Sequence, residues 1–105
     1  MTPEEHDCSV GLVSHLPQVV SSLLAARLIP ATEQAIGLAG AGLRDTTRVA
    51  SSDPELWVQI LGANRGPVVE LLDAFARDLT GFADALRDPA QVGARRKIAD
   101  LLSAG

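Results

Sequence analysis

The feature that most constrains the fold is a run of apolar residues between positions 68 and 86, spaced alternately four and three residues apart. This spacing predicts an α-helix with a heptad stripe. Charged side chains lie on its opposite side, where Asp73 and Arg77 are spaced to form an i,i+4 ion pair. The stripe, which we call the heptad seam, consists of Val68, Leu72, Phe75, Leu79, Phe82 and Leu86.

The heptad seam needs a surface that covers it, because the chain has only 105 residues. It could pack against the first helix of the same chain. It could equally pair with a second copy, since small helical domains often complete their core by dimerising. The spacing favours neither arrangement over the other.

Helix start signals divide the rest of the chain. Thr2 and Glu5 have the form of a capping box, and they open a helix that is apolar on more than one face. We expect Pro17 to kink this helix or to mark a join between two helices, because proline lacks the N–H that an interior turn uses.

Further helices are predicted along the remaining sequence. A short helix is expected at 32–38, and Gly40-Ala41-Gly42 should end it in a flexible turn. Residues 43–50 suggest a short helix or an irregular turn. Asp53-Pro54 should start a helix that ends near Gly62, and Asp88-Pro89 should cap the last one. Because no segment alternates like a strand, we predict an all-α single domain, 1–105, of five or six helices.

Composition agrees with this class and argues against several functions. Hydrophobic residues make up 47% of the chain but aromatic residues only 3%, which suits helices better than sheets. The lone Cys8, the acidic N-terminus and the polar interruptions within residues 10–28 predict a cytoplasmic protein without a membrane span. A net charge of −4, with one short basic cluster at 95–97, argues against nucleic-acid binding.

Three polar features stand in apolar surroundings. His15 lies in the first helix beside Pro17, Arg44 and Arg48 follow the glycine turn, and Trp57 comes soon after. A guanidinium there could bind a carboxylate through two parallel hydrogen bonds. A purely structural role would also explain these residues, in the core for His15 and Trp57 and at the surface for the arginines. The sequence contains no metal-ligand cluster and no glycine-rich phosphate loop.

Taken together, four segments resemble the prephenate dehydrogenase family in order and spacing, over about residues 4 to 87, and His6-Asp7 fits as well. The segments are Ser14-His15-Leu16-Pro17, Gly40 to Ala50, Ser52 to Trp57, and Asn64-Arg65. The resemblance is to the helical C-terminal dimerisation domain of that family. It implies a fold like the C-terminal domain of 6-phosphogluconate-dehydrogenase-type enzymes.

The resemblance implies an enzymatic context. In that family an N-terminal Rossmann domain binds NAD or NADP, and the helical domain pairs with its twin and closes the active site. The reaction is oxidative decarboxylation of prephenate to 4-hydroxyphenylpyruvate in tyrosine biosynthesis, or of arogenate to tyrosine. Which substrate, which cofactor, and whether tyrosine inhibits by feedback all remain open.

The resemblance also implies substrate-binding residues. Arg48 matches an arginine that holds a substrate carboxylate, and His15 matches a histidine of the substrate pocket. Asp45 and Arg44 match a neighbouring ionic pair, and Trp57 matches an aromatic residue near the pocket entrance.

The sequence departs from the family pattern at three positions. Gln18 stands where a second histidine is common, and Ala41 and Leu43 replace a glycine and an aromatic residue of the glycine turn. The family's nucleotide-binding glycines and catalytic histidine belong to its Rossmann domain, for which these 105 residues offer no candidate. We therefore expect no catalytic, cofactor-binding or metal-binding residue here, and no activity from the chain alone. The alternative is a stand-alone helical module that only associates with itself.

Overall fold

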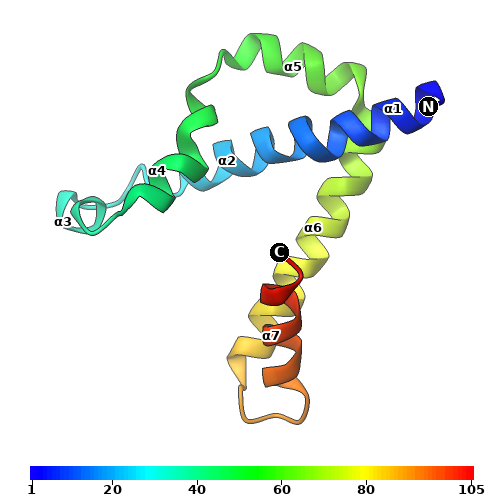
Figure 1. The fold of residues 1–105 in the computed structure, drawn as a ribbon. Helices are drawn as coiled ribbons and strands as arrows, with labels where there is room; N and C mark the ends of the chain where they lie inside the picture. The colour runs from blue at the N-terminus through cyan, green and yellow to red at the C-terminus, as the bar shows by residue number, and fades with distance from the viewer. The chain divides into compact units, whose positions relative to one another are not determined.

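The computed structural model describes residues 1–105, which form helices and connecting turns only. The chain has two compact units, Met1–Leu71 and Leu72–Gly105 (Figure 1). With the unbroken helical run Pro3–Ala26 counted once, there are six helices. The prediction of an all-α fold with five or six helices is confirmed.

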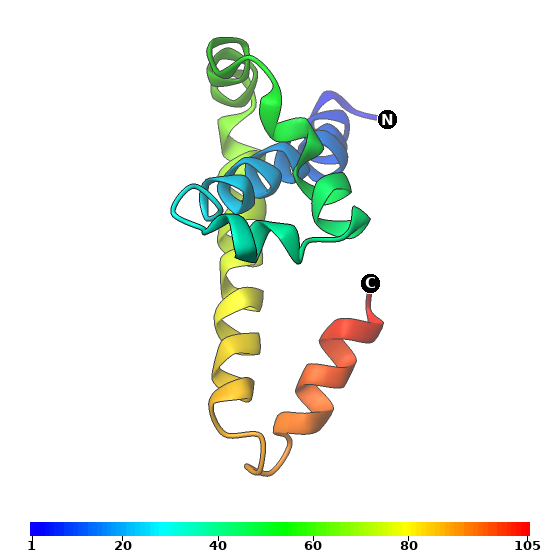
Figure 2. The ribbon, with the colours of Figure 1, turned by 90° about the vertical axis from the view of Figure 1, so that its left-hand side faces the viewer.

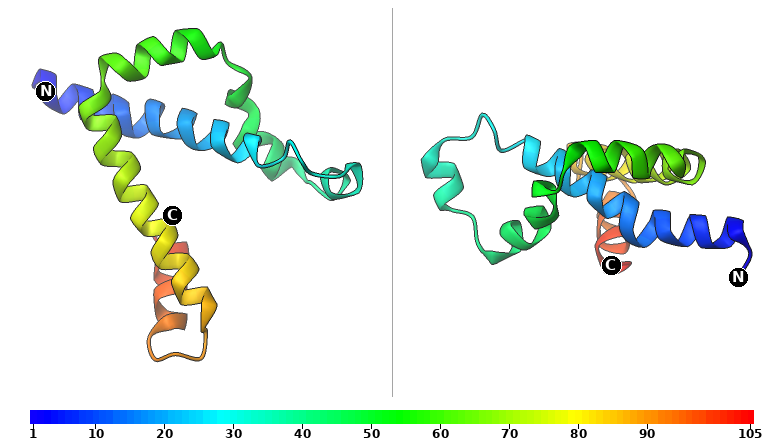
Figure 3. Two further views of the ribbon diagram at one scale, coloured as in Figure 1. Left: turned by 180° about the vertical axis from the view of Figure 1, so that it is seen from behind. Right: turned by 90° about the horizontal axis from the view of Figure 1, so that it is seen from above.

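The first unit begins with one continuous helical run, seen from behind in Figure 3. It consists of α1 (Pro3–Val10), the π-helical segment η1 (Gly11–His15) and α2 (Leu16–Ala26). The backbone N–H of Glu5 donates to Thr2 Oγ1 at 3.1 Å, which confirms the predicted helix start.

Pro17 marks the join between η1 and α2 without breaking the helix. The N–H of Leu16 donates to the carbonyl of Gly11, five residues back, so the helix is widened directly before the proline. In a regular α-helix the ring would clash with the carbonyl of Val13, and that carbonyl would lose its donor. The predicted join between two helices is therefore not found: the run continues as one helix, which accommodates the proline through a π-helical turn.

The rest of the first unit consists of short helices. They are α3 (Glu33–Gly37), α4 (Ala41–Thr47), the 3-10 helix η2 (Arg48–Ser51), α5 (Pro54–Ala63) and the beginning of α6 (Arg65–Arg87). Thr32 caps α3 through a hydrogen bond from the N–H of Ala35, and Asp53 caps α5 through one from the N–H of Glu55. The predicted starts of both helices are confirmed.

The predicted flexible turn at Gly40-Ala41-Gly42 is wrong. Gly40 has an extended backbone and precedes α4, while Ala41 and Gly42 already belong to the first turn of that helix. The hydroxyls of Thr46 and Thr47 donate to carbonyls four residues back, at 2.7 and 2.8 Å. The helix forms although Gly42, in its first turn, makes the helical conformation intrinsically costly.

The second unit is a helical hairpin of α6 from Leu72 onward and α7 (Ala94–Ser103), seen most clearly in Figure 2. The predicted cap at Asp88-Pro89 is wrong, because residues 88–93 form the connecting loop. Gly93 directly precedes α7 with φ +86°, a conformation that residues with a side chain rarely adopt.

Few apolar side chains are fully covered. Val68, at the start of the heptad seam, is 5% exposed, whereas Leu79 and Leu86 are 57% and 52% exposed. These two residues of the seam are therefore largely uncovered within the chain, while Phe82 between them is partly buried. The predicted ion pair in α6 does not form between Asp73 and Arg77. The pair that does form joins Arg87 and Asp84, at 3.2 Å.

The run Pro3–Ala26 is long and apolar enough to cross a membrane by length and composition alone. A stretch of 18 residues within this run has a mean hydropathy of 1.4, and 22% of that stretch is buried. The polar residues that were expected to make residues 10–28 a poor membrane span thus do not keep this helix from meeting the criterion. Core helices of soluble proteins and N-terminal signal sequences meet the same criterion. The exposed Leu12, Val13 and Leu23 show that much of its apolar surface is open.

Candidate functional site

Three buried polar side chains lie on one side of the first helix, at intervals of three residues. His15 and Gln18 are each 7% exposed, and Ser21 is 3% exposed. Buried polar groups destabilise a fold unless they find hydrogen-bond partners. The partners of His15 and Gln18 show which later segments of the chain this side of the helix contacts.

His15 is held by two residues from distant parts of the first unit. Its Nδ1 lies 3.0 Å from Nδ2 of Asn64, which stands between α5 and α6. Its ring meets the ring of Trp57 edge to face, with centroids 6.1 Å apart and an interplanar angle of 82°. This arrangement is favourable for aromatic rings and fixes the orientation of the imidazole.

The other ring nitrogen of His15, Nε2, has no hydrogen-bond partner within the chain. Ser21 Oγ is the one side-chain polar atom that is both fully covered and unpaired. Nε2 therefore reaches the surface, although the residue as a whole is buried. A ligand outside the helix can form a hydrogen bond with it.

Gln18 connects the first helix to the turn that carries Arg48. Its Nε2 donates to the carbonyl of Val49 at 2.8 Å, and that carbonyl also accepts bonds from the N–H and the hydroxyl of Ser52. The hydroxyl of Ser51 donates to the carbonyl of Arg48 at 3.1 Å. The backbone of η2 is thereby held at several points.

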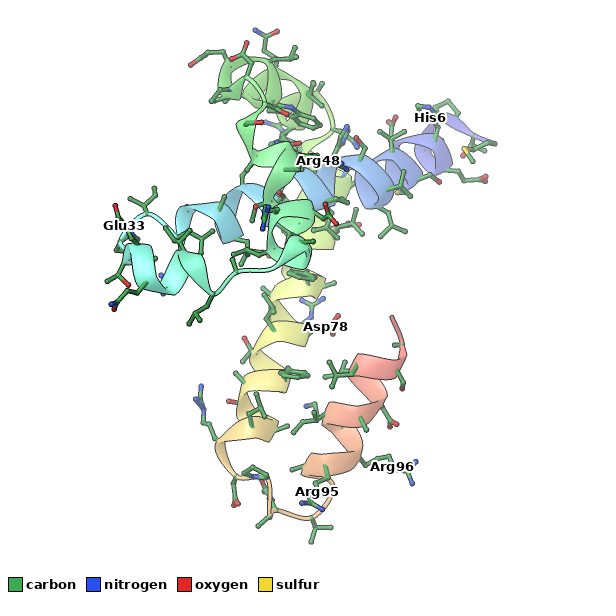
Figure 4. All side chains as sticks on the ribbon, turned by 60° about the vertical axis from the view of Figure 1, so that its left-hand side comes forward. His6, Glu33, Arg48, Asp78, Arg95 and Arg96 are labelled. Carbon is green, nitrogen blue, oxygen red and sulfur yellow. The ribbon has the colours of Figure 1, made fainter.

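Arg48 itself is exposed and forms no ion pair with any carboxylate of the chain. Figure 4 labels it on the segment that follows α4. A charged side chain on an anchored backbone, with no internal partner, is available to a ligand carboxylate. No hydrogen bond or ion pair joins Arg48 directly to His15. Their connection runs through Gln18 and Val49.

A hollow of about 360 Å³ lies between α2 and α5, beside Ser52. Gln18 and Trp57 contribute to its wall, and most of the remaining lining is apolar. Its volume is in the range of small-molecule sites. Trp57 thus contacts both this hollow and His15, whereas neither His15 nor Arg48 lines it.

Arg44 and Asp45 do not form the expected ionic pair. Both are exposed and no ion pair includes either residue. Arg44 lines a separate hollow of about 380 Å³ together with Leu28 and Leu43. The structure therefore groups His15, Trp57 and the anchored turn of Arg48 around α2, and places Arg44 at a different hollow.

Sequence reasoning missed the role of Asn64 and of Gln18. In the sequence, Asn64 stands out only as part of a segment that resembles the family, and Gln18 only as a departure from the family pattern. One signal in the sequence does point to Gln18: polar residues recur every three positions in a very apolar helix, at His15, Gln18 and Ser21, and such residues need hydrogen-bond partners when buried. The sequence does not reveal those partners, which lie 31 and 49 residues away.

Residues 2–99 match a family model described as "Prephenate dehydrogenase, dimerization domain". The chain is 36% identical to the prephenate dehydrogenase of Bacillus subtilis over 86 residues, which are 75% of this chain and 22% of that relative. It is 35% identical over 85 residues to a probable prephenate dehydrogenase of Streptomyces niveus, covering 80% of this chain and 24% of the relative. A cyclohexadienyl dehydrogenase of Zymomonas mobilis is 32% identical over 90 residues, with 82% and 31% covered.

The chain thus spans between 22% and 31% of the length of these relatives. The match to the family model includes α1 to α6 and every residue of the candidate site. An unrelated helical module is therefore excluded. The chain belongs to the prephenate dehydrogenase family and corresponds to its dimerization domain.

Proposed function

We propose that this chain is the dimerising and substrate-binding part of an NAD(P)-dependent prephenate dehydrogenase of the cytoplasm. The observation that carries the proposal is the hydrogen bond from Gln18 to the carbonyl of Val49. It ties the unpaired Arg48 to the helix whose buried polar side includes His15. The free and exposed Cys8, which forms no disulfide, agrees with a reducing compartment.

The residues around α2 suit a negatively charged substrate with a ring. The Arg48 guanidinium can bind a carboxylate through two parallel hydrogen bonds. The Nε2 of His15, which has no partner within the chain, can bond to a polar group of the same molecule. Trp57 supplies an aromatic wall beside the imidazole. In this proposal the chain binds and orients prephenate.

The nicotinamide cofactor does not fit the residues described here. Dinucleotides bind where a strand meets a helix through a glycine-rich turn, and this chain forms no strand. The glycines at the start of α4 follow the short helix α3 and not a strand. We therefore assign cofactor binding to a separate Rossmann domain that must act with this chain.

We further propose that the far end of the heptad seam and the first helix form a homodimer interface. Leu79 and Leu86 of the seam and Val13 of the first helix are each more than half exposed. Large exposed apolar side chains on a helix are typical of a surface covered by a partner. The family description as a dimerization domain supports a second copy as that partner.

The proposal is tested by assaying reduction of NAD⁺ and NADP⁺ with prephenate and with arogenate. The chain alone should show no activity, and the chain joined to a nucleotide-binding domain of the family should be active with prephenate. Turnover by the chain alone would contradict the division of roles. A folded, dimeric joined protein that uses neither substrate would contradict the function.

A further inference from the structure

The side-chain amide of Asn64 has a fixed orientation. Its Nδ2 lies 2.9 Å from the backbone carbonyl oxygen of Asp7 and 3.0 Å from Nδ1 of His15. A backbone carbonyl can only accept a hydrogen bond, so the amide nitrogen must face it. Rotating the amide by 180° would place its oxygen against the carbonyl oxygen, which is unfavourable.

This orientation determines the role of His15 Nδ1. An amide nitrogen donates hydrogen bonds and does not accept them, so Nδ1 must be the acceptor. A ring nitrogen that accepts a hydrogen bond carries no proton. In the neutral imidazole the proton then resides on Nε2, the nitrogen that has no partner within the chain.

The surroundings preserve this geometry. The carbonyl of Asp7 also accepts a bond from the N–H of Gly11, at the start of the π-helical segment that ends with His15. A Cβ atom at Gly11 would lie 3.1 Å from Cδ1 of Leu71 and 3.4 Å from Nδ2 of Asn64, so the glycine allows α6 and the amide to approach the helix closely. Asn64 thus contacts both ends of the π-helical segment. Its amide donates to the carbonyl of Asp7, which also accepts from the first residue, Gly11, and it lies against the ring of the last residue, His15.

We infer that Asn64 is a positioning residue that holds His15 as the Nε2–H tautomer, so that His15 presents a hydrogen-bond donor to an oxygen atom of the substrate. The tautomer follows from contacts within the chain alone. Its use toward substrate rests on the proposed function. A ring with the proton on Nε2 can stabilise a carboxylate or carbonyl oxygen, and it cannot remove a proton from a substrate hydroxyl with that nitrogen.

The tautomer can be measured directly on the 105-residue chain. Long-range ¹H–¹⁵N correlation spectra distinguish the two tautomers, and the chain has only two histidines, which His6→Gln separates. We expect the neutral His15 ring to carry its proton on Nε2. In Asn64→Asp, which has the same shape but no donor, the proton should move to Nδ1.

The control is Gln59→Glu, an exposed amide-to-acid change on α5 that should leave the His15 spectrum unchanged. A proton on Nδ1 in the unaltered chain would overturn the inference even if Asn64→Asp does not fold. A folded Asn64→Asp variant with an unchanged tautomer would also overturn it.

The use of the tautomer is tested separately, in the active protein that contains a nucleotide-binding domain. There Asn64→Asp should lower kcat/KM on the order of tenfold, the effect of one lost hydrogen bond. If the tautomer reverses but kcat/KM is unchanged, the donor role toward substrate is wrong. An unaltered protein without activity would instead count against the proposed function.

Discussion

The side-chain Nε2 of Gln18 lies 2.8 Å from the backbone carbonyl oxygen of Val49, 31 residues away in the sequence. This bond connects the buried polar side of α2 to the first residues of η2. Gln18 occupies a position where the family often has a second histidine. Here the residue serves as a structural connection between the helix and the turn that carries Arg48.

Gln18→Glu should therefore destabilise the chain. The carboxylate keeps the shape of the side chain but cannot donate, so two oxygens face each other in a site that is 7% exposed. We expect a loss of about 2 kcal/mol in the free energy of unfolding, measured by urea denaturation. The same change at the exposed Gln59 should alter it by less than about 0.5 kcal/mol. Equal effects at both positions would show that the bond to Val49 is not stabilising.

Substitution of the open part of the heptad seam should weaken the proposed homodimer. Leu79→Glu places a charge in the middle of the interface, and we expect the dissociation constant to rise about 100-fold or more. Sedimentation equilibrium measures this constant. Val92→Glu is the control, because Val92 is fully exposed in the loop before α7 and outside the seam. If the two variants associate equally well, the seam is not the interface.

Replacing Gly62 and Gly93 with alanine should change the stability of the chain in opposite directions. A Cβ at Gly62 in α5 meets no atom within 4 Å, so Gly62→Ala should stabilise the helix by about 0.5 kcal/mol and raise Tm by about 3 °C. Gly93 has φ +86°, so Gly93→Ala should cost about 1–2 kcal/mol and lower Tm. Differential scanning calorimetry measures both changes. A Gly93→Ala variant as stable as the unaltered chain would contradict the left-handed turn before α7.

The helix starts at Thr2, Thr32 and Asp53 could be predicted, because capping joins residues only two or three positions apart. The last helix was misplaced for a similarly local reason. Asp88-Pro89 has the composition of a cap, but the positive φ of Gly93 ends the loop and lets α7 begin at Ala94. Composition at the start of a loop does not indicate how many residues the chain needs before it turns back.

The candidate site was only partly predictable. The resemblance singled out His15, Arg48 and Trp57, and the structure places His15 against Trp57. The bonds that orient these residues come from Asn64 and Gln18, whose partners are distant in sequence. Such contacts depend on how the helices pack, and spacing within one helix does not encode them.

The central claim is that the anchored but unpaired guanidinium of Arg48 binds the substrate carboxylate. It is tested most directly by the KM for prephenate of Arg48→Ala, in the protein that contains a nucleotide-binding domain, with Arg48→Lys as the comparison. The account predicts that KM rises about 100-fold in Arg48→Ala and less in Arg48→Lys, which keeps the charge but loses the paired hydrogen bonds. Thermal stability should barely change, because Arg48 is exposed and has no ion pair in the chain. An unchanged KM, or a loss of stability in place of a loss of binding, would contradict it.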